Sequence, residues 1–237
     1  MTISPSSFFA VVANTSTRPF GTERTMFTCG IIEDAFVIET ERLALRSPRL
    51  ADAAAIACLA GDKAVAEMTA QIPHPYPPGL AEQFVSMARA GNAAGQHLVL
   101  VAAFRHTPDE IIGAFGVAPD REASLPSVGY WLGTPFWGLG LATEALRGLI
   151  DTLFARSDSR GLSAAVRVVN PASRHVLEKC GFHHDGAGFR DFPARGGRLP
   201  VDLFTLERGI WASLKRWGPA VVVEGVRNDT ALTAPLG

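Results

Sequence analysis

The stretch GYWLGTPFWGLGLATEALRGLI, residues 129–150, limits the fold more than any other part of this 237-residue chain. It starts within SVGYWL (127–132), an apolar run typical of a strand, and continues into a helix predicted from about residue 141 to 155. Thr134-Pro135 predicts a turn between the two elements. Apolar side chains recur in the helix at steps of three and four, so one face must be buried: Ala142, Ala145, Leu146, Leu149, Ile150, Leu153 and Phe154.

Strands and helices are mixed through the middle of the chain. Asp52 and Gly61 bound one helix as N-cap and stop, and Asn170, Pro171 and Gly181 bound another as N-cap, first helical residue and C′ residue. The mixture predicts an α/β (α+β) domain with a mixed sheet. The predicted strands are 42–46, 97–104, 111–117, 127–132, 162–169 and 201–208, with RHTPDE as a hairpin turn, and the further helices are 52–61 and 78–91, the latter burying Leu80, Phe84, Met87 and Ala88.

The two ends of the chain lack this pattern. Residues 1–36 are rich in Ser and Thr and are predicted to be a poorly ordered extension or a leader, with Met26 as an alternative start. Residues 218–237 are predicted to be a C-terminal tail. The length allows one domain with extensions or two small domains, and we expect a single domain over residues 37–217.

Charge and cysteine content exclude several classes of protein. The net charge is −1 and no run of Lys or Arg is present, so nucleic-acid and membrane-surface partners are not expected. Cys29, Cys58 and Cys180 are far apart and odd in number, which favours neither a disulfide framework nor a zinc site. A reducing compartment, the cytoplasm, follows as the expected location. No apolar run reaches the ~20 residues that a membrane-spanning helix needs.

Gly138 and Gly140 come where the helix begins, and small residues there let a ligand approach backbone N–H groups that have no helical partner. The helix dipole favours an anion at this end, so a phosphate or pyrophosphate fits. A Walker A loop is excluded because no Lys lies near. A Rossmann loop is disfavoured, since the third small position is missing and the next strand ends in Asn170 rather than an acid. The remaining alternative is that the glycines only allow close packing.

Three stretches in order, ETERLALR (39–46), GYWLGTPFWGLGLATEAL (129–146) and VNPASRHVLEKCGF (169–182), resemble the GCN5-related N-acetyltransferases (GNAT family). The resemblance is strongest to the branch with the ribosomal-protein alanine acetyltransferases, and it spans residues 39 to about 208. It implies a mixed, mostly antiparallel central sheet flanked by helices. It also implies acetyl-CoA as co-substrate and no metal.

The resemblance implies a set of site residues. The family's pyrophosphate loop aligns with Trp137 to Ala142, and Trp137 and Leu139 stand where the family often has charged or polar side chains. The loop therefore lacks its usual cation, and backbone donors would do more of the binding. The implied cofactor-binding residues are Trp131, Leu132, Trp137, Gly138, Leu139, Gly140, Leu141, Ala142, Thr143, Asn170 and Ser173.

Acetyl transfer from a thioester also needs a donor for the oxyanion and a proton for the departing thiolate. The resemblance places the oxyanion donor on the backbone from Tyr130 to Leu132, with Gly129 suited to a bulge or a close approach. It makes Ser173 the candidate general acid, although a hydroxyl at this helix position can also serve only the local backbone. The predicted catalytic residues are thus Ser173 and Tyr130. No general base is assigned among Glu122, His106 and Asp191.

The resemblance leads to one main functional hypothesis and an alternative. The main hypothesis is transfer of an acetyl group from acetyl-CoA to a primary amine, by direct attack in a ternary complex. The acceptor is a protein N-terminal α-amine or a small amine, and homodimer formation is left open. The alternative is a non-catalytic acyl-CoA-binding or sensing domain on the same fold, because fold does not fix function. A dinucleotide enzyme is a third and weaker hypothesis.

Overall fold

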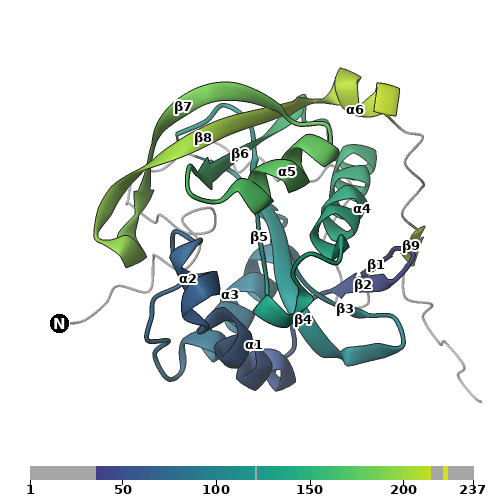
Figure 1. The fold of residues 1–237 in the computed structure, drawn as a ribbon. Helices are drawn as coiled ribbons and strands as arrows, with labels where there is room; N and C mark the ends of the chain where they lie inside the picture. Colours follow the sequence, from purple (N-terminus) through teal and green to yellow (C-terminus); the bar gives the residue numbers. More distant parts are fainter. Residues whose placement is uncertain (1–35, 121, 215–220, 224–237) are drawn as a thin grey trace, which may run out of the picture.

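A computed structural model describes residues 36–120, 122–214 and 221–223 (Figure 1). The extension at 1–35, Cys29 and most of the expected C-terminal tail lie outside the described residues. Within them, the strands are β1 (Val37–Glu39), β2 (Leu43–Arg46), β3 (Leu98–Phe104), β4 (Thr107–Ala118), β5 (Ser127–Leu132), β6 (Gly161–Arg167), β7 (His183–Phe192), β8 (Gly197–Glu207) and β9 (Val221–Val223).

The α-helices of the described residues are α1 (Ala53–Ala60), α2 (Lys63–Glu67), α3 (Leu80–Ala93), α4 (Leu141–Arg156), α5 (Pro171–Lys179) and α6 (Arg208–Leu214). Three short 3₁₀ turns accompany them: η2 (Leu50–Asp52), η3 (Thr134–Phe136) and η4 (Pro193–Arg195). No helix among the described residues is long and apolar enough to cross a membrane.

The described strands form one sheet in the order β7-β8-β6-β5-β4-β3-β2-β1-β9. Every neighbouring pair is antiparallel except β5 and β6, which are parallel and share the single register pair Ser127↔Ser163. Because the two strands pair only at their start, they diverge, and the C-terminal half of β5 has an open edge on the β6 side. The predicted mixed, mostly antiparallel sheet flanked by helices is confirmed.

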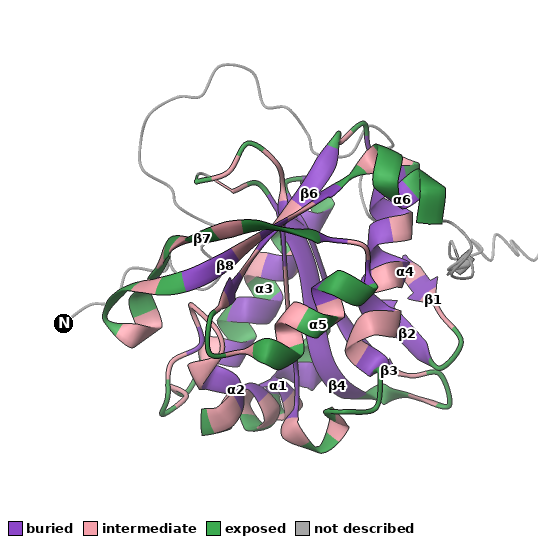
Figure 2. Cartoon of the chain, turned by 45° about the horizontal axis from the view of Figure 1, so that its top comes forward, coloured by how far each residue is buried: buried purple, intermediate pink, exposed green. Residues whose placement is uncertain are grey.

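Two apolar cores lie on opposite faces of the sheet. One packs α4, α5 and α6 against β1 to β6 through residues such as Leu141, Leu146 and Phe115. The other packs α1, α2 and α3 against β3, β4 and β5 and contains Phe84 and Trp131. Figure 2 shows β3 and most of β4 buried between these layers, whereas β7 is largely exposed. Strand β8 adds Phe204 and Leu206 to the first core, so only β7 and the tip of the hairpin extend beyond the cores.

Asp52 occupies the predicted N-cap position of α1, but its side chain does not cap this helix. Its two carboxylate oxygens instead accept hydrogen bonds from Nη1 and Nη2 of Arg46, both at 2.8 Å, and one also accepts from the backbone N–H of Arg49. Burial alone would raise the pKa of Asp52, but these hydrogen bonds and the positive charges hold it below its usual value. Asp52 thus joins β2 to the start of α1.

Other differences from the sequence predictions concern short or exposed elements. The turn between β3 and β4 is two residues long, Arg105 and His106, so β4 begins inside the predicted RHTPDE turn. In α3, Phe84 and Ala88 are buried as predicted, but Leu80 and Met87 are only partly buried. The elements β1, α2, β7, α6 and β9 are not predicted individually from the sequence, and β9 pairs with β1 from within the segment expected to be a tail.

Candidate functional site

A cavity of about 1050 Å³ lies around the open edge of β5. The starts of α4 and α5 line one end, and helices α1, α2 and α3 together with the β7–β8 hairpin line the other. The exposed Leu139 is the one predicted site residue that does not line it. The others all do: Tyr130, Trp131, Leu132, Trp137, Gly138, Gly140, Leu141, Ala142, Thr143, Asn170 and Ser173.

Gly138 and Gly140 are needed for their backbone conformation. Both have positive φ, 75° and 76°, where side chains other than glycine's are strained. A Cβ on Gly138 would meet no atom within 4 Å, and a Cβ on Gly140 would meet only Nη2 of Arg42 at 3.6 Å, an ordinary contact. The alternative that these glycines only allow close packing is therefore wrong.

Gly140 is also the N-cap of α4, with no side-chain cap. The first helical hydrogen bond runs from the N–H of Glu144 to the carbonyl of Gly140. The N–H groups of Leu141, Ala142 and Thr143 consequently have no partner inside the helix. Since these three residues line the cavity, this end of the cavity suits an anionic group.

Arg42, at the start of β2, brings a positive charge to the glycine loop. Its Nη1 donates to the carbonyl of Leu139 at 3.1 Å, and its Nε donates to Oε2 of Glu144 at 2.6 Å. The prediction from the sequence considered only the residues of the loop itself and did not include Arg42. The loop sequence lacks a cation, but a residue 97 positions away from Leu139 supplies it.

Glu144 lies in the first turn of α4. Its Oε1 accepts hydrogen bonds from the hydroxyl of Thr40 at 2.6 Å and from the backbone N–H of Arg42 at 2.7 Å. Burial by itself would raise the pKa of Glu144, but the bonds from Thr40 and Arg42 and the charge of Arg42 lower it. The carboxylate is therefore ionised and neutralised by Arg42, rather than left to repel an anion at the helix start.

The open edge of β5 carries backbone groups that face the cavity. The N–H of Gly133 donates to the carbonyl of Ile112, and residues of an antiparallel ladder alternate between facing their partner and facing away. By this alternation, Tyr130 and Leu132 direct their backbone groups away from β4. Nε1 of Trp137 donates to the carbonyl of Leu132 at 2.7 Å on this edge. The N–H groups of Tyr130 and Leu132 are thus available for a ligand oxygen.

Gly129 does not form a bulge, because β4 and β5 keep a regular register through the pair Gly116↔Gly129. A Cβ on Gly129 would meet no atom within 4 Å, and the residue lines the cavity. A side chain at this position would therefore project into open space within the cavity.

Ser173 and Tyr130 meet across the divergence of β5 and β6. The phenol oxygen of Tyr130 lies 2.8 Å from Oγ of Ser173 and also donates to the Ser173 carbonyl at 3.2 Å. Asn170 caps α5, as predicted, by accepting from the N–H of Ser173 at 3.1 Å. Burial raises the pKa of Tyr130, so the phenol stays protonated at neutral pH. The pair is a neutral hydroxyl chain at the wall of the cavity.

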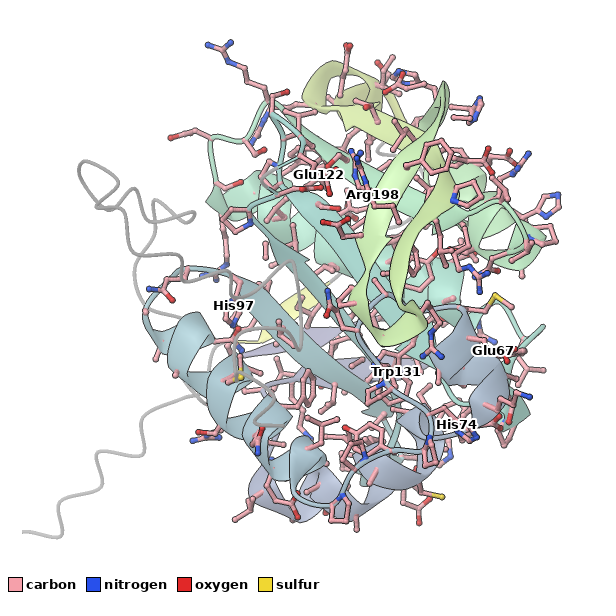
Figure 3. The ribbon with its side chains drawn as sticks, turned by 90° about the vertical axis from the view of Figure 1, so that its left-hand side faces the viewer. Glu67, His74, His97, Glu122, Trp131 and Arg198 are labelled. Carbon is pink, nitrogen blue, oxygen red and sulfur yellow. The ribbon has the colours of Figure 1, made fainter. Side chains whose placement is uncertain are left out.

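The three residues considered as a base have other contacts. Oε2 of Glu122 pairs with Arg198 at 2.9 Å and with Arg190 at 3.7 Å, and Asp191 pairs with Arg198 at 3.4 Å. Figure 3 shows Glu122 and Arg198 side by side near the hairpin. His106 stacks on Phe104, with ring centroids 5.4 Å apart. Among the described residues, no group of His, Cys, Asp and Glu could hold a metal ion.

The loop HPYPP (74–78) contributes one residue to the cavity wall. It joins α2 to α3, and Tyr76 lines the cavity. Trp131 also lines the cavity, but its side chain belongs to the core under α1–α3 rather than to the α4 side. Of the residues that sequence reasoning missed, Arg42 carried a signal, since it lies in ETERLALR, one of the stretches behind the family resemblance.

Comparisons with known proteins show the family to which this chain is related. The family model described as "Acetyltransferase (GNAT) domain" matches residues 42–183. The chain is 31% identical to the "Uncharacterized N-acetyltransferase p20" of Bacillus licheniformis over 166 residues, which covers 70% of this chain and 91% of that protein.

Solved structures share the fold at low identity. RimJ from Mycobacterium smegmatis, in complex with CoA-disulfide, superposes with a TM-score of 0.62 at 23% identity, covering 74% of this chain and 88% of that one. Spermidine N-acetyltransferase from Vibrio cholerae, in complex with CoA and spermine, gives 0.59 at 17% identity, covering 72% and 98%. With the family match over more than half of its length, the chain belongs to the GNAT family of acetyl-CoA-dependent acetyltransferases.

Proposed function

We propose that this protein transfers the acetyl group of acetyl-CoA directly to a primary amine while both substrates are bound. The observation that carries the proposal is that the Tyr130–Ser173 hydroxyl pair and the glycine loop line the same cavity. Beyond β5, the same cavity is lined by residues of α1, α2, α3 and the β7–β8 hairpin. One end can hold the donor and the other the acceptor. The domain that does this is proposed to span residues 37–217.

The donor end is suited to the pyrophosphate of acetyl-CoA. The N–H groups at the start of α4 face the cavity, and Arg42 offsets the charge of Glu144 beside them. Anions bind at such helix starts because the donors and the dipole act together. Asn170 and Ser173, at the start of α5, would lie along the pantetheine arm.

The reaction joins the amine nitrogen to the thioester carbonyl carbon and then breaks the carbon–sulfur bond. The N–H groups of Tyr130 and Leu132 would donate to the oxygen that becomes negative in between. The hydroxyl of Ser173, held by Tyr130, would give its proton to the departing sulfur and regain one from solvent water. The proton that leaves nitrogen passes to solvent water, and no side chain is assigned as its acceptor.

The acceptor is proposed to be a protein N-terminal α-amine or a small-molecule amine. Structural relatives are named for both kinds, among them a ribosomal-protein-S5-alanine acetyltransferase from Vibrio fischeri and the Vibrio cholerae spermidine enzyme. Cys58 and Cys180 are unpaired, which supports a reducing compartment and hence the cytoplasm as the place of reaction.

The proposal is tested by initial rates of thiol release with acetyl-CoA and a panel of primary amines. Amine-dependent release, with intersecting double-reciprocal lines when both substrates are varied, would support direct transfer in a ternary complex. Parallel lines would instead indicate an acetylated enzyme intermediate. Tight binding of acetyl-CoA without release for any amine would favour the non-catalytic sensing domain. Stabilisation against heat by NAD but not by CoA would contradict the assignment as a whole.

A further inference from the structure

We propose that the acceptor amine carries an apolar substituent, which binds in the end of the cavity between β5 and helices α1 to α3. This inference rests on the proposed function and narrows its substrate class. The chemistry named is a primary amine with an aromatic or branched aliphatic group next to it. Such an amine can be a small molecule or the first residue of a peptide.

The wall of this end is apolar. It is formed by side chains from α1, α2, the loop before α3, α3 and β5, namely Ile56, Ala60, Val65, Tyr76, Phe84 and Trp131. These side chains belong to or pack against the core on the α1–α3 face of the sheet. Apart from Tyr76, these side chains are at most 8% exposed, so the gain comes mainly from the apolar surface of the ligand itself, at about 25 cal/mol for each Å² removed from water. The substrate that exploits this wall has an apolar group.

Four carboxylates line the cavity; Glu67, Glu122 and Asp191 are paired with cations, and Asp120 accepts a hydrogen bond from the backbone N–H of Glu122. Glu122 contacts both Arg198 and Arg190, and Asp191 contacts Arg198. Oε1 of Glu67 lies 3.8 Å from Nζ of Lys63, one turn earlier in α2. An acceptor with several positive charges would have to compete with these cations for each carboxylate. The charge pattern therefore disfavours a polyamine and leaves the apolar wall as the main source of selectivity.

The β7–β8 hairpin covers this end of the cavity. Its tip is attached to the segment after α2, because the N–H of Ala194 donates to the carbonyl of Ala70 at 3.1 Å and Arg195 donates to the carbonyl of Ile72. Arg167 of β6 donates to the carbonyl of Glu67 in the same region. Figure 3 views this side, with Trp131 labelled near the hairpin tip. The hairpin tip and the segment after α2 therefore enclose part of this end of the cavity.

Gly129 offers a way to fill this end without disturbing the protein. Side chains alternate along a strand, so Gly129 and Trp131 face the same side of β5. A Cβ on Gly129 would meet no atom within 4 Å, and its φ is not in the left-handed region. Gly129→Val would place a side chain in the proposed pocket. Gly209→Val on α6 is the matched control, since a Cβ there also meets no atom within 4 Å and the residue does not line the cavity.

The experiment measures kcat/KM at saturating acetyl-CoA for 2-phenylethylamine, ethanolamine and spermidine. Two tripeptides, beginning with phenylalanine or serine, form the peptide arm. The wild-type protein is expected to prefer phenylethylamine to ethanolamine, and the phenylalanine peptide to the serine peptide, by about tenfold or more. If kcat/KM is higher for phenylethylamine than for the phenylalanine peptide, the acceptor is a small molecule; if it is lower, the acceptor is a peptide N-terminus. Gly129→Val should lower kcat/KM for the aromatic amines about tenfold and leave ethanolamine within about threefold of the wild type. Gly209→Val should match the wild type throughout.

Two results would overturn the inference while leaving acetyl transfer intact. One is a higher kcat/KM for spermidine than for either aromatic amine. The other is an aromatic preference that Gly129→Val leaves unchanged, because the substituent would then bind elsewhere. Thiol release with none of the five acceptors, in a protein that binds acetyl-CoA, would remove the proposed function and this inference with it.

Discussion

The phenol oxygen of Tyr130 lies 2.8 Å from Oγ of Ser173, although the two residues are 43 positions apart. Tyr130 belongs to β5 and Ser173 to the first turn of α5, so the contact crosses the point where β5 and β6 diverge. The hydroxyl of Ser173 is thereby held by a side chain as well as by its place next to the Asn170 cap. A serine that only serves the start of a helix does not need a second side chain to hold its hydroxyl group.

Tyr130→Phe removes the hydroxyl and keeps the ring, which stacks on Phe115 at a centroid distance of 5.6 Å. We expect kcat to fall about tenfold, because Ser173 loses the partner that orients it, and the KM for acetyl-CoA to change little. Phe115→Leu, which disturbs the stack but not the hydroxyl pair, is the control. An unchanged kcat in Tyr130→Phe would show that the phenol does not serve Ser173.

Arg42→Gln removes the cation beside the glycine loop and leaves Glu144 without its charged partner. We expect the Kd for CoA to rise about tenfold, which corresponds to about 1.4 kcal/mol. Arg105→Gln is the control, since Arg105 forms an exposed pair with Glu39 at 3.2 Å. Calorimetry measures the Kd for CoA in both variants. Equal affinities in the two variants would mean that Arg42 has no part in holding the loop or its ligand.

Gly140→Val and Gly138→Val place a β-branched side chain at a positive φ. The left-handed conformation costs such residues roughly 1–2 kcal/mol, so the loop should shift and bind CoA more weakly. The domain should still fold, because neither Cβ would meet a crowded neighbour. Circular dichroism checks the fold, and calorimetry checks CoA binding. Gly209→Val, which has open space but lies away from the cavity, should bind CoA normally.

His97 gives a prediction on pH. Its ring is buried beside α3, with Nε2 3.3 Å from the carbonyl of Ala88, and burial lowers its pKa (Figure 3). The unfolded chain therefore takes up the proton more readily, so the stability is full above about pH 6.5 and falls as the pH drops below it. The loss is at most about 1.4 kcal/mol for each pH unit. Denaturant melts from pH 7.5 to 5 measure this loss of unfolding free energy. A His97→Gln variant should lose less stability over the same pH range. An equal slope in both proteins would assign the pH dependence to other groups.

Elements with strong local signals could be predicted from the sequence. Helix α4 has an unbroken apolar stripe, and α5 has Asn170, Pro171 and Gly181 at its ends. The glycine loop was found because Gly138 and Gly140 precede a helix start. In all of these the signal lies within about 20 neighbouring residues, the range over which periodicity and capping act.

Contacts between distant residues could not be predicted. Arg42 meets Glu144 across 102 positions, and no local pattern shows that the start of β2 reaches the start of α4. The side-chain pair of Tyr130 and Ser173 likewise depends on how far β5 and β6 diverge. Strand β7 was not predicted, since most of its residues are exposed and no alternating apolar pattern marks it.

Ser173 is proposed to act on the departing thiolate at the junction of β5 and α5. The most direct measurement is kcat for acetyl transfer by Ser173→Ala, with Ser213→Ala on α6 as the matched control, because the Ser213 hydroxyl only donates to the carbonyl of Gly209. We expect kcat to fall about a hundredfold in Ser173→Ala, with the Kd for acetyl-CoA within about threefold of the wild type, and Ser213→Ala to match the wild type. A kcat for Ser173→Ala equal to that of the wild type at every pH would contradict this role.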